Sequence, residues 1–160
     1  MRLHTLRSIL SAPDRTLAFR YILLASAMNL VWEVAQLPLY TIWRTAEERD
    51  LVYAVLHCTA GDVMILAAAL LLALLLVGDG AWPGRSYARV AVAATTFGVG
   101  YAVLSEWLNV EILRNWAYAP TMLLLPPLGT GLTPFLQWLV VPPVALWLVG
   151  AAQKRSLLNR

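Results

Sequence analysis

The chain has 160 residues, of which 60% are hydrophobic and only 13% are charged, and its mean hydropathy is +0.67. So few charges cannot cover that much apolar surface in water, which excludes a soluble globular domain. The single cysteine excludes an internal disulfide and a site of several thiolates, and the pI of 9.4 indicates contact with anionic lipids rather than with nucleic acid.

The N-terminal part of the chain leads into a first apolar segment. Residues 2–11 combine leucines with arginines, which fits either a short interfacial helix or a frayed tail. Pro13 then predicts the first turn of a helix. The first long apolar segment covers about 20–43, and Pro38 predicts that its helix bends or ends there. We interpret this segment as a membrane span that is retained in the mature protein.

Three further apolar segments follow, at about 52–77, 88–113 and 134–152, and each is long enough to cross a bilayer. Residues 115–133, here called the lid segment, are apolar but contain several prolines and glycines. Irregular backbone cannot cross lipid, so we expect this segment to lie over the outer ends of the helices. The sequence therefore predicts an all-α polytopic membrane protein, a single domain over 1–160 with four transmembrane helices and an irregular lid.

The positions of the basic residues predict the orientation of the chain. The N-terminal segment, the loop between the second and third spans and the C-terminal tail together contain nine arginines and lysines. The opposite side has only Arg44, Arg49 and Arg114. Because loops rich in basic residues stay in the cytoplasm, both termini are predicted to be cytoplasmic.

Polar residues inside the apolar segments share one depth. At about 1.5 Å per helical residue, Glu33, Asp62 and Glu106 each lie roughly 10–16 Å below the outer boundary of their span. The cytoplasmic half of the spans contains no comparable set. We therefore expect one polar pocket that opens to the outer side of the membrane.

The charge balance of this layer points to function. Apart from Arg20 and Arg89 at their cytoplasmic ends, the four spans contain no lysine or arginine, so His57 is the single candidate cation beside Glu33, Asp62 and Glu106. Unpaired carboxyl groups at low dielectric must be protonated, hydrated or bound to a cation. Ionisable residues within a membrane are candidates for function. A purely structural alternative is that protonated acids and amides form hydrogen bonds between helices.

The candidate site residues form two groups. The candidate catalytic residues have ionisable side chains, and they are Glu33, Glu106, His57 and Asp62. The candidate ligand-binding residues are amides and aromatic side chains, and they are Asn29, Gln36, Asn109, Gln137, Trp107, Trp116 and Tyr118. Any one of these amides or tryptophans is more often a packing or lipid-facing residue, so only their shared depth indicates a site.

A bound divalent metal is an alternative for the same layer. His57 together with Asp62, Glu33 and Glu106 would offer nitrogen and oxygen ligands acceptable to zinc or iron. A haem with two axial histidines is excluded within one chain, because the spans contain one histidine. The cofactor is otherwise left open.

Two family resemblances add to this interpretation. The segments WEVAQLPLY, HCTAGD, SEWLN, WAY and GLTPFLQWLVVPP resemble an uncharacterised family of small bacterial four-helix inner-membrane proteins over nearly the whole chain. This resemblance implies the bacterial inner membrane, with the outer side periplasmic, and no particular activity.

About a quarter of the chain also resembles the EXPERA group, which includes emopamil-binding sterol isomerases. The matching residues are Glu33 with the following QLPLY, and VLH ending at His57. In that group a membrane acid donates or shuttles a proton while aromatic residues stabilise a cationic intermediate. The resemblance therefore implies an acid role for Glu33.

Three functions are compatible with these features. The first is a periplasm-facing intramembrane pocket that binds a small or lipid-soluble ligand, or acts on it by acid–base chemistry. The second is an accessory or assembly subunit of a larger membrane complex. The third is a proton or cation channel or transporter, which would need an oligomer because one chain lacks a polar path through its cytoplasmic half. The expected partners are membrane lipids, a lipid-soluble ligand, and a membrane subunit or further copies of the chain.

Overall fold

The computed structural model describes residues 12–79 and 82–158, so the segment 2–11 lies outside the described residues. Four long helices dominate it: α2 (Ala12–Gln36), α4 (Glu48–Val77), α5 (Tyr87–Trp107) and α6 (Leu132–Leu158). Each is long and apolar enough to cross a membrane. The prediction of an all-α architecture with four membrane-length helices is confirmed.

The first helix has Pro13 in its first turn and ends before Pro38 as predicted, so it extends beyond the N-terminal end of the apolar segment 20–43 and stops short of its C-terminal end. It starts at Ala12, next to Pro13, and its α-helical part stops at Gln36. The 3-10 turn η1 (Leu37–Leu39) contains Pro38 and is followed by the short helix α3 (Ile42–Thr45). Proline lacks a backbone N–H and disfavours helix in the residue before it, which explains why α2 ends here.

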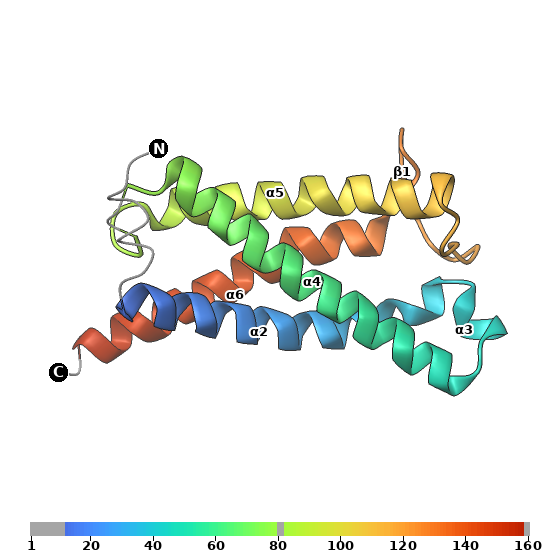
Figure 1. Cartoon of the computed structure of the whole chain (residues 1–160), viewed down its shortest axis with the longest axis horizontal. Helices are drawn as coiled ribbons and strands as arrows, with labels where there is room; N and C mark the ends of the chain where they lie inside the picture. Colours follow the sequence, from blue (N-terminus) through green and yellow to red (C-terminus); the bar gives the residue numbers. More distant parts are fainter. Residues whose placement is uncertain (1–11, 80–81, 159–160) are drawn as a thin grey trace.

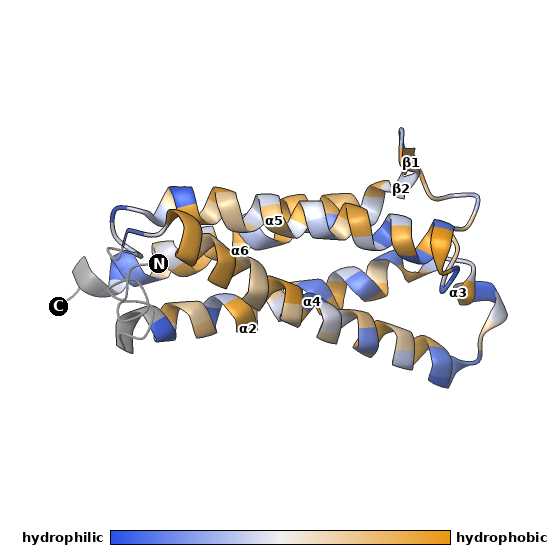
Figure 2. Cartoon of the chain, turned by 45° about the horizontal axis from the view of Figure 1, so that its top comes forward, coloured by the Kyte–Doolittle hydropathy of each residue, from blue (hydrophilic) through white to orange (hydrophobic). Residues whose placement is uncertain are grey.

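The helices form a closed ring of neighbours. α2 packs between α4 and α6, and α5 packs between the same two helices on the other side. The start of α2, the end of α6 and the loop between α4 and α5 lie at one end of the bundle, and α3 and the strand β1 lie at the other (Figure 1). Figure 2 shows mostly hydrophobic residues along the helices and hydrophilic ones mainly toward the two ends. Helices that follow one another in the chain are therefore neighbours, as in an up-and-down bundle.

Small residues let α5 approach α6 closely. Val90, Ala94, Gly98 and Ala102 lie four apart on one buried stripe of α5. A Cβ atom added to Gly98 would lie 2.4 Å from the ring of the buried Trp138 on α6. The glycine is therefore required by the bulk of the tryptophan, as small residues commonly are where membrane helices pack.

The lid segment is more ordered than predicted. It contains two short antiparallel strands, β1 (Leu124–Leu125) and β2 (Thr130–Gly131), which were not predicted, and the rest of it before α6 is irregular as predicted. Its first part is fixed to the end of α2. The Thr41 N–H donates to the Ala117 carbonyl at 2.9 Å, and the Ala119 N–H donates to the Leu39 carbonyl at 2.8 Å. These bonds satisfy backbone groups that the break at Pro38 leaves free.

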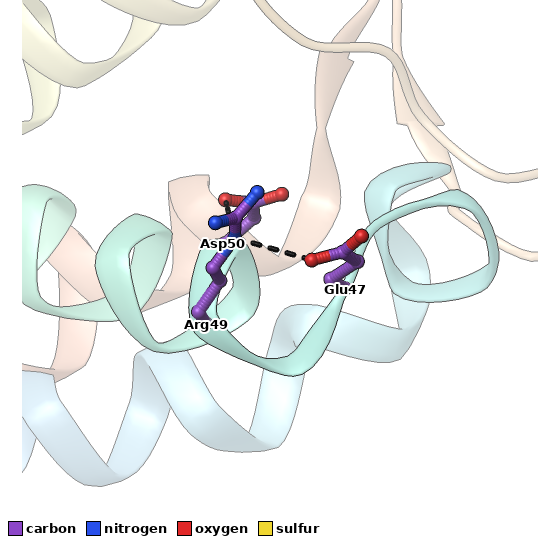
Figure 3. Close-up of polar contacts among 3 residues, drawn as sticks. All are labelled: Glu47, Arg49 and Asp50. Carbon is purple, nitrogen blue, oxygen red and sulfur yellow. Dashed lines mark ion pairs between the residues drawn. The ribbon is translucent and has the colours of Figure 1, made fainter.

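The described ion pairs lie at the ends of the helices. Before and within the first turn of α4, Arg49 Nε lies 3.1 Å from Glu47 Oε2 and 3.6 Å from Asp50 Oδ1 (Figure 3). At the other end, Arg89 pairs with Asp79. These side chains are solvent-accessible, so each pair contributes little to stability.

Candidate functional site

A buried glutamine on α6 joins three helices. The Gln137 amide nitrogen lies 3.0 Å from a Glu33 oxygen, 3.0 Å from an Asp62 oxygen and 3.4 Å from the Asn29 side-chain oxygen. Gln137 is only 2% exposed. Its position five residues into α6 is level with the last turns of α2, so the amide meets acids from both α2 and α4.

A second amide completes this group. The Gln36 nitrogen donates to Glu33 Oε1 at 2.9 Å and to Gln137 Oε1 at 3.2 Å. Asn29, Glu33 and Gln36 lie on one side of α2 because they follow the i, i+4, i+7 spacing of a helix. We call the five residues Asn29, Glu33, Gln36, Asp62 and Gln137 the acid–amide cluster. Hydrogen bonds between helices show that these residues lie at one level of the bundle.

No positively charged side chain of the described residues pairs with the acids of this cluster. Within residues 12–79 and 82–158 no lysine, arginine or histidine pairs with Glu33 or Asp62. One acceptor is also left over: the Gln36 side-chain oxygen is buried and has no hydrogen-bond partner, although Gln36 is only 5% exposed. A buried oxygen without a donor costs free energy. The cluster therefore holds two carboxyl groups without a cationic partner and one buried acceptor without a donor.

The third acid, Glu106, contacts the lid segment. The Tyr118 hydroxyl donates to Glu106 and accepts a hydrogen bond from the Gly131 N–H at 2.9 Å. Burial, and after it the neighbouring Glu106 charge, raise the pKa of Tyr118 above its ordinary value, so the hydroxyl keeps its proton. A Cβ atom at Gly131 would lie 3.0 Å from the Tyr118 ring, which explains the glycine.

Further aromatic groups surround Glu106. The Tyr40 ring packs against the Tyr118 ring, with centroids 5.5 Å apart and an interplanar angle of 51°. The Tyr40 hydroxyl and the Trp116 indole N–H act electrostatically on the Glu106 carboxyl. The Trp116 indole nitrogen is buried, and within the described residues it makes no hydrogen bond of ordinary geometry, so it interacts with the carboxyl group of Glu106 only through the charge of that group. Glu106 is thus surrounded by donors, whereas the acid–amide cluster has too few.

A local widening of the helix follows Glu106 almost directly. α5 continues as the π-helix η2 (Leu108–Ile112), in which the Leu113 N–H donates to the Leu108 carbonyl at 2.8 Å. The Asn109 side chain donates to the Ser105 carbonyl at 2.8 Å and so occupies an acceptor that an α-helix would offer to the backbone. Short π-helical turns are frequent at functional sites.

The two groups form one electrostatic region. The charge of Glu33 influences both Asp62 and Glu106, and charges on all three carboxyl groups influence the part-buried Cys58 thiol. Glu33 and Glu106 are themselves only part-buried, while Asp62 is 7% exposed. The region is therefore accessible at Glu33 and Glu106 and closed at Asp62.

Three predicted site residues lie elsewhere. His57 is exposed on α4 and stacks on Tyr53, with ring centroids 5.6 Å apart. Asn109 turns toward the lid, where it accepts a hydrogen bond from Asn115 at 2.7 Å. Trp107 is part-buried, and within the described part of the chain it makes no hydrogen bond or ring contact with either group. Asp62 and His57 are five residues apart, which places them on different sides of one helix.

The arrangement gives no support to the metal alternative. Within the described residues, no three histidine, cysteine, aspartate or glutamate side chains converge to hold an ion. The set of His57, Asp62, Glu33 and Glu106 is divided because His57 faces outward. The four residues do not form one coordination shell.

Sequence reasoning did not assign a role to Tyr40 or Cys58, although both gave a signal. Tyr40 continues the α2 stripe four residues after Gln36, and Cys58 lies four residues before Asp62. The Gly131 N–H and the π-helix gave no sequence signal, because both depend on how the lid folds back on the helices.

Searches of protein-family models, of curated proteins and of solved structures find no match to this chain, so the site is interpreted from its own chemistry.

Proposed function

We propose that this chain is a multi-pass protein of the bacterial inner membrane, and that its function depends on the acid region formed by Glu33, Asp62 and Glu106. In this proposal the region faces the periplasm and binds a small or lipid-soluble ligand, or acts on it by acid–base chemistry. The observation that carries the proposal is the Gln137 amide, which holds two carboxyl groups from different helices where no described cation offsets their charge. Uncompensated acids at membrane depth are costly and are kept where a function needs them.

The orientation can be tested independently of the site. Reporter fusions after Asp50 and after Gly129 are expected to report the periplasm, and a fusion after Gly84 the cytoplasm, because basic residues gather on the side of the termini. A periplasmic result at Gly84 would invert the topology and place the acids on the cytoplasmic side.

The roles of the acids follow from their surroundings. Glu33 accepts hydrogen bonds from two amides, which hold its carboxyl group in place, and its part-burial leaves room for exchange with a ligand. Glu106 receives the Tyr118 proton donor and lies next to two further aromatic donors. We propose Glu33 and Glu106 as the acid–base or cation-binding pair, with Asp62 supporting Glu33 through Gln137.

The test is to compare Glu33→Gln and Glu106→Gln with the unaltered protein. Glutamine keeps the size and hydrogen-bonding capacity of the acid but removes its ionisable proton and charge. We expect the bundle to fold with a thermal midpoint within a few degrees of the original, and the co-purifying ligand to fall by about tenfold or more. Native mass spectrometry measures bound ligand, and thermal unfolding in detergent measures stability.

The matched control is Glu111→Gln, since Glu111 is exposed near the same end of the bundle. It is expected to change neither measurement. A structural role for the acids predicts the opposite pattern, in which glutamine is tolerated fully and Glu33→Leu loosens the bundle. Unchanged ligand content in both glutamine variants would rule out the proposed site.

One surface favours the second candidate, an accessory subunit. An apolar groove of about 350 Å³ lies between α4 and α5, and its lining includes Gly61, Ala68 and Tyr101. A Cβ atom added to Gly61 or Gly100 would meet nothing within 4 Å, so packing inside this chain does not require either glycine. Small residues on an outer helix face would let a helix of another subunit approach.

A further inference from the structure

The acid–amide cluster has fewer donors than acceptors. Its three amides, on Asn29, Gln36 and Gln137, supply six N–H hydrogens, and its amide and carboxyl groups contain seven oxygen acceptors. The Gln137 nitrogen alone lies within reach of three acceptors, on Asn29, Glu33 and Asp62, and has two hydrogens to share among them. The Gln36 oxygen accepts from no group of the described chain. The cluster therefore calls for additional N–H or O–H donors.

Exchanging the nitrogen and oxygen positions of the Gln36 amide does not remove the shortage of hydrogen-bond donors. It would place the Gln36 oxygen where its nitrogen now lies, 2.9 Å from Glu33 Oε1 and 3.2 Å from Gln137 Oε1. Two oxygens at that distance repel unless a proton lies between them. The observed orientation is the better one, and in it the buried oxygen still lacks a donor.

The shortage coincides with two carboxyl groups that have no cationic partner. Glu33 and Asp62 both face the Gln137 nitrogen, and no described cation pairs with either. With Gln36 in its present orientation, a proton on either acid would remove a charge but leave the Gln36 oxygen unsatisfied, because the Glu33 oxygen beside Gln36 contacts its nitrogen. A metal ion is disfavoured because, among the described residues, no three histidine, cysteine, aspartate or glutamate side chains could hold one. A group that carries one positive charge and several N–H donors meets both needs.

We propose that the acid–amide cluster binds a primary ammonium group. Its three N–H donors suit the Gln36 oxygen and the carboxyl oxygens of Glu33 and Asp62, at the distances of about 2.7–3.2 Å typical of such bonds. This inference rests on the proposed function and names its ligand class. The amine is carried on an apolar or amphiphilic molecule, because the cluster lies between membrane-length helices.

The neighbouring aromatic groups fit the same ligand. Tyr40 and Tyr118 pack together between the lid segment and the end of α2, and Glu106 lies beside them. Aromatic faces and a carboxylate both attract an ammonium group. Glu33 is part-buried, so the amine can approach the cluster from this side and leave its apolar portion among the helices.

The experiment uses the full-length protein in nanodiscs of phosphatidylglycerol, a lipid without an amine. Octylamine, octyltrimethylammonium and octanol are titrated while thermal unfolding and native mass spectra are recorded. We expect octylamine to bind and to raise the unfolding temperature, and the other two to have no saturable effect. The quaternary ion has the charge without N–H donors, and the alcohol has a donor without the charge.

Variants locate the binding. Glu33→Gln and Asp62→Asn are expected to weaken octylamine binding by about 10- to 100-fold, the range given by loss of a charge-assisted hydrogen bond. Glu111→Gln is the control and should bind as the unaltered protein does. Equal binding of octylamine and octyltrimethylammonium, or equal binding by all variants, overturns the proposal.

A second experiment, with a different lipid in the nanodiscs, identifies the source of the amine. Nanodiscs that contain phosphatidylethanolamine are compared with the amine-free ones. Competition with octylamine indicates a lipid headgroup as the natural ligand, and undiminished octylamine binding indicates a free amine; both results support the ammonium site. Failure of this inference differs from failure of the proposed function. If octylamine does not bind but the Glu33→Gln and Glu106→Gln variants still lose their co-purifying ligand, the acid site stands and the ammonium class is wrong.

Discussion

Replacing Gln137 with leucine is expected to lower the free energy of unfolding by about 3 kcal/mol, the largest effect of any single substitution in the acid–amide cluster. Leucine has nearly the same volume but no polar atoms. The Glu33, Asp62 and Asn29 oxygens would lose their common donor, and the Gln36 nitrogen would lose one of its acceptors. Breaking a buried polar network from its centre costs more than breaking it at its edge.

The matched control is Gln153→Leu, the same change near the far end of the same helix. Gln153 is part-buried and makes no described hydrogen bond, so a change within about 0.5 kcal/mol is expected. Unfolding in detergent by a chemical denaturant, followed by tryptophan fluorescence, measures both variants. If Gln137→Leu is as stable as Gln153→Leu, the amide does not hold the three helices together.

Replacing Gly98 with alanine is expected to destabilise the bundle by about 1–3 kcal/mol, although alanine has a higher helix propensity than glycine. The added Cβ atom would lie 2.4 Å and 2.8 Å from two atoms of the Trp138 ring. Trp138 is only 4% exposed and cannot move aside without displacing α6. Overpacking therefore outweighs the gain in helix propensity.

Gly100→Ala tests this reasoning two residues further along α5. A Cβ atom there would meet nothing within 4 Å, so only the propensity term remains. We expect Gly100→Ala to be neutral or stabilising by up to about 1 kcal/mol. Opposite signs for the two alanine variants, measured by the same denaturation assay, support the close contact between α5 and α6. Equal effects would contradict it.

Local sequence patterns were sufficient to predict most of the fold. Apolar segments long enough to span a bilayer predicted the four helices, and Pro38 predicted where the first one ends. The depth of Glu33, Asp62 and Gln137 also followed from counting residues along each helix, because the rise per residue is constant. The hydrogen bonds among them confirm that count. The strands at 124–125 and 130–131 were missed, because a two-residue strand has no periodicity to detect.

The residues of the site could be predicted only as a set. His57 and Asp62 share a depth, yet one faces outward beside Tyr53 and the other faces Gln137. Sequence spacing gives the angle between them around the helix but not the rotation of that helix in the bundle. Asn109 was expected at the site for the same reason and instead bonds to Ser105 and Asn115.

What the sequence determined by itself is therefore everything that depends on one helix at a time: length, hydropathy, the position of breaks and the depth of each polar group. What only the tertiary structure decided is which side of each helix faces its neighbours. The amide of Gln137 on α6 meets carboxyl groups on α2 and α4, and the hydroxyl of Tyr118 in the lid meets Glu106 on α5. These contacts join residues far apart in the chain, and they form because helix packing fixes the rotation of each helix, which local propensity leaves free.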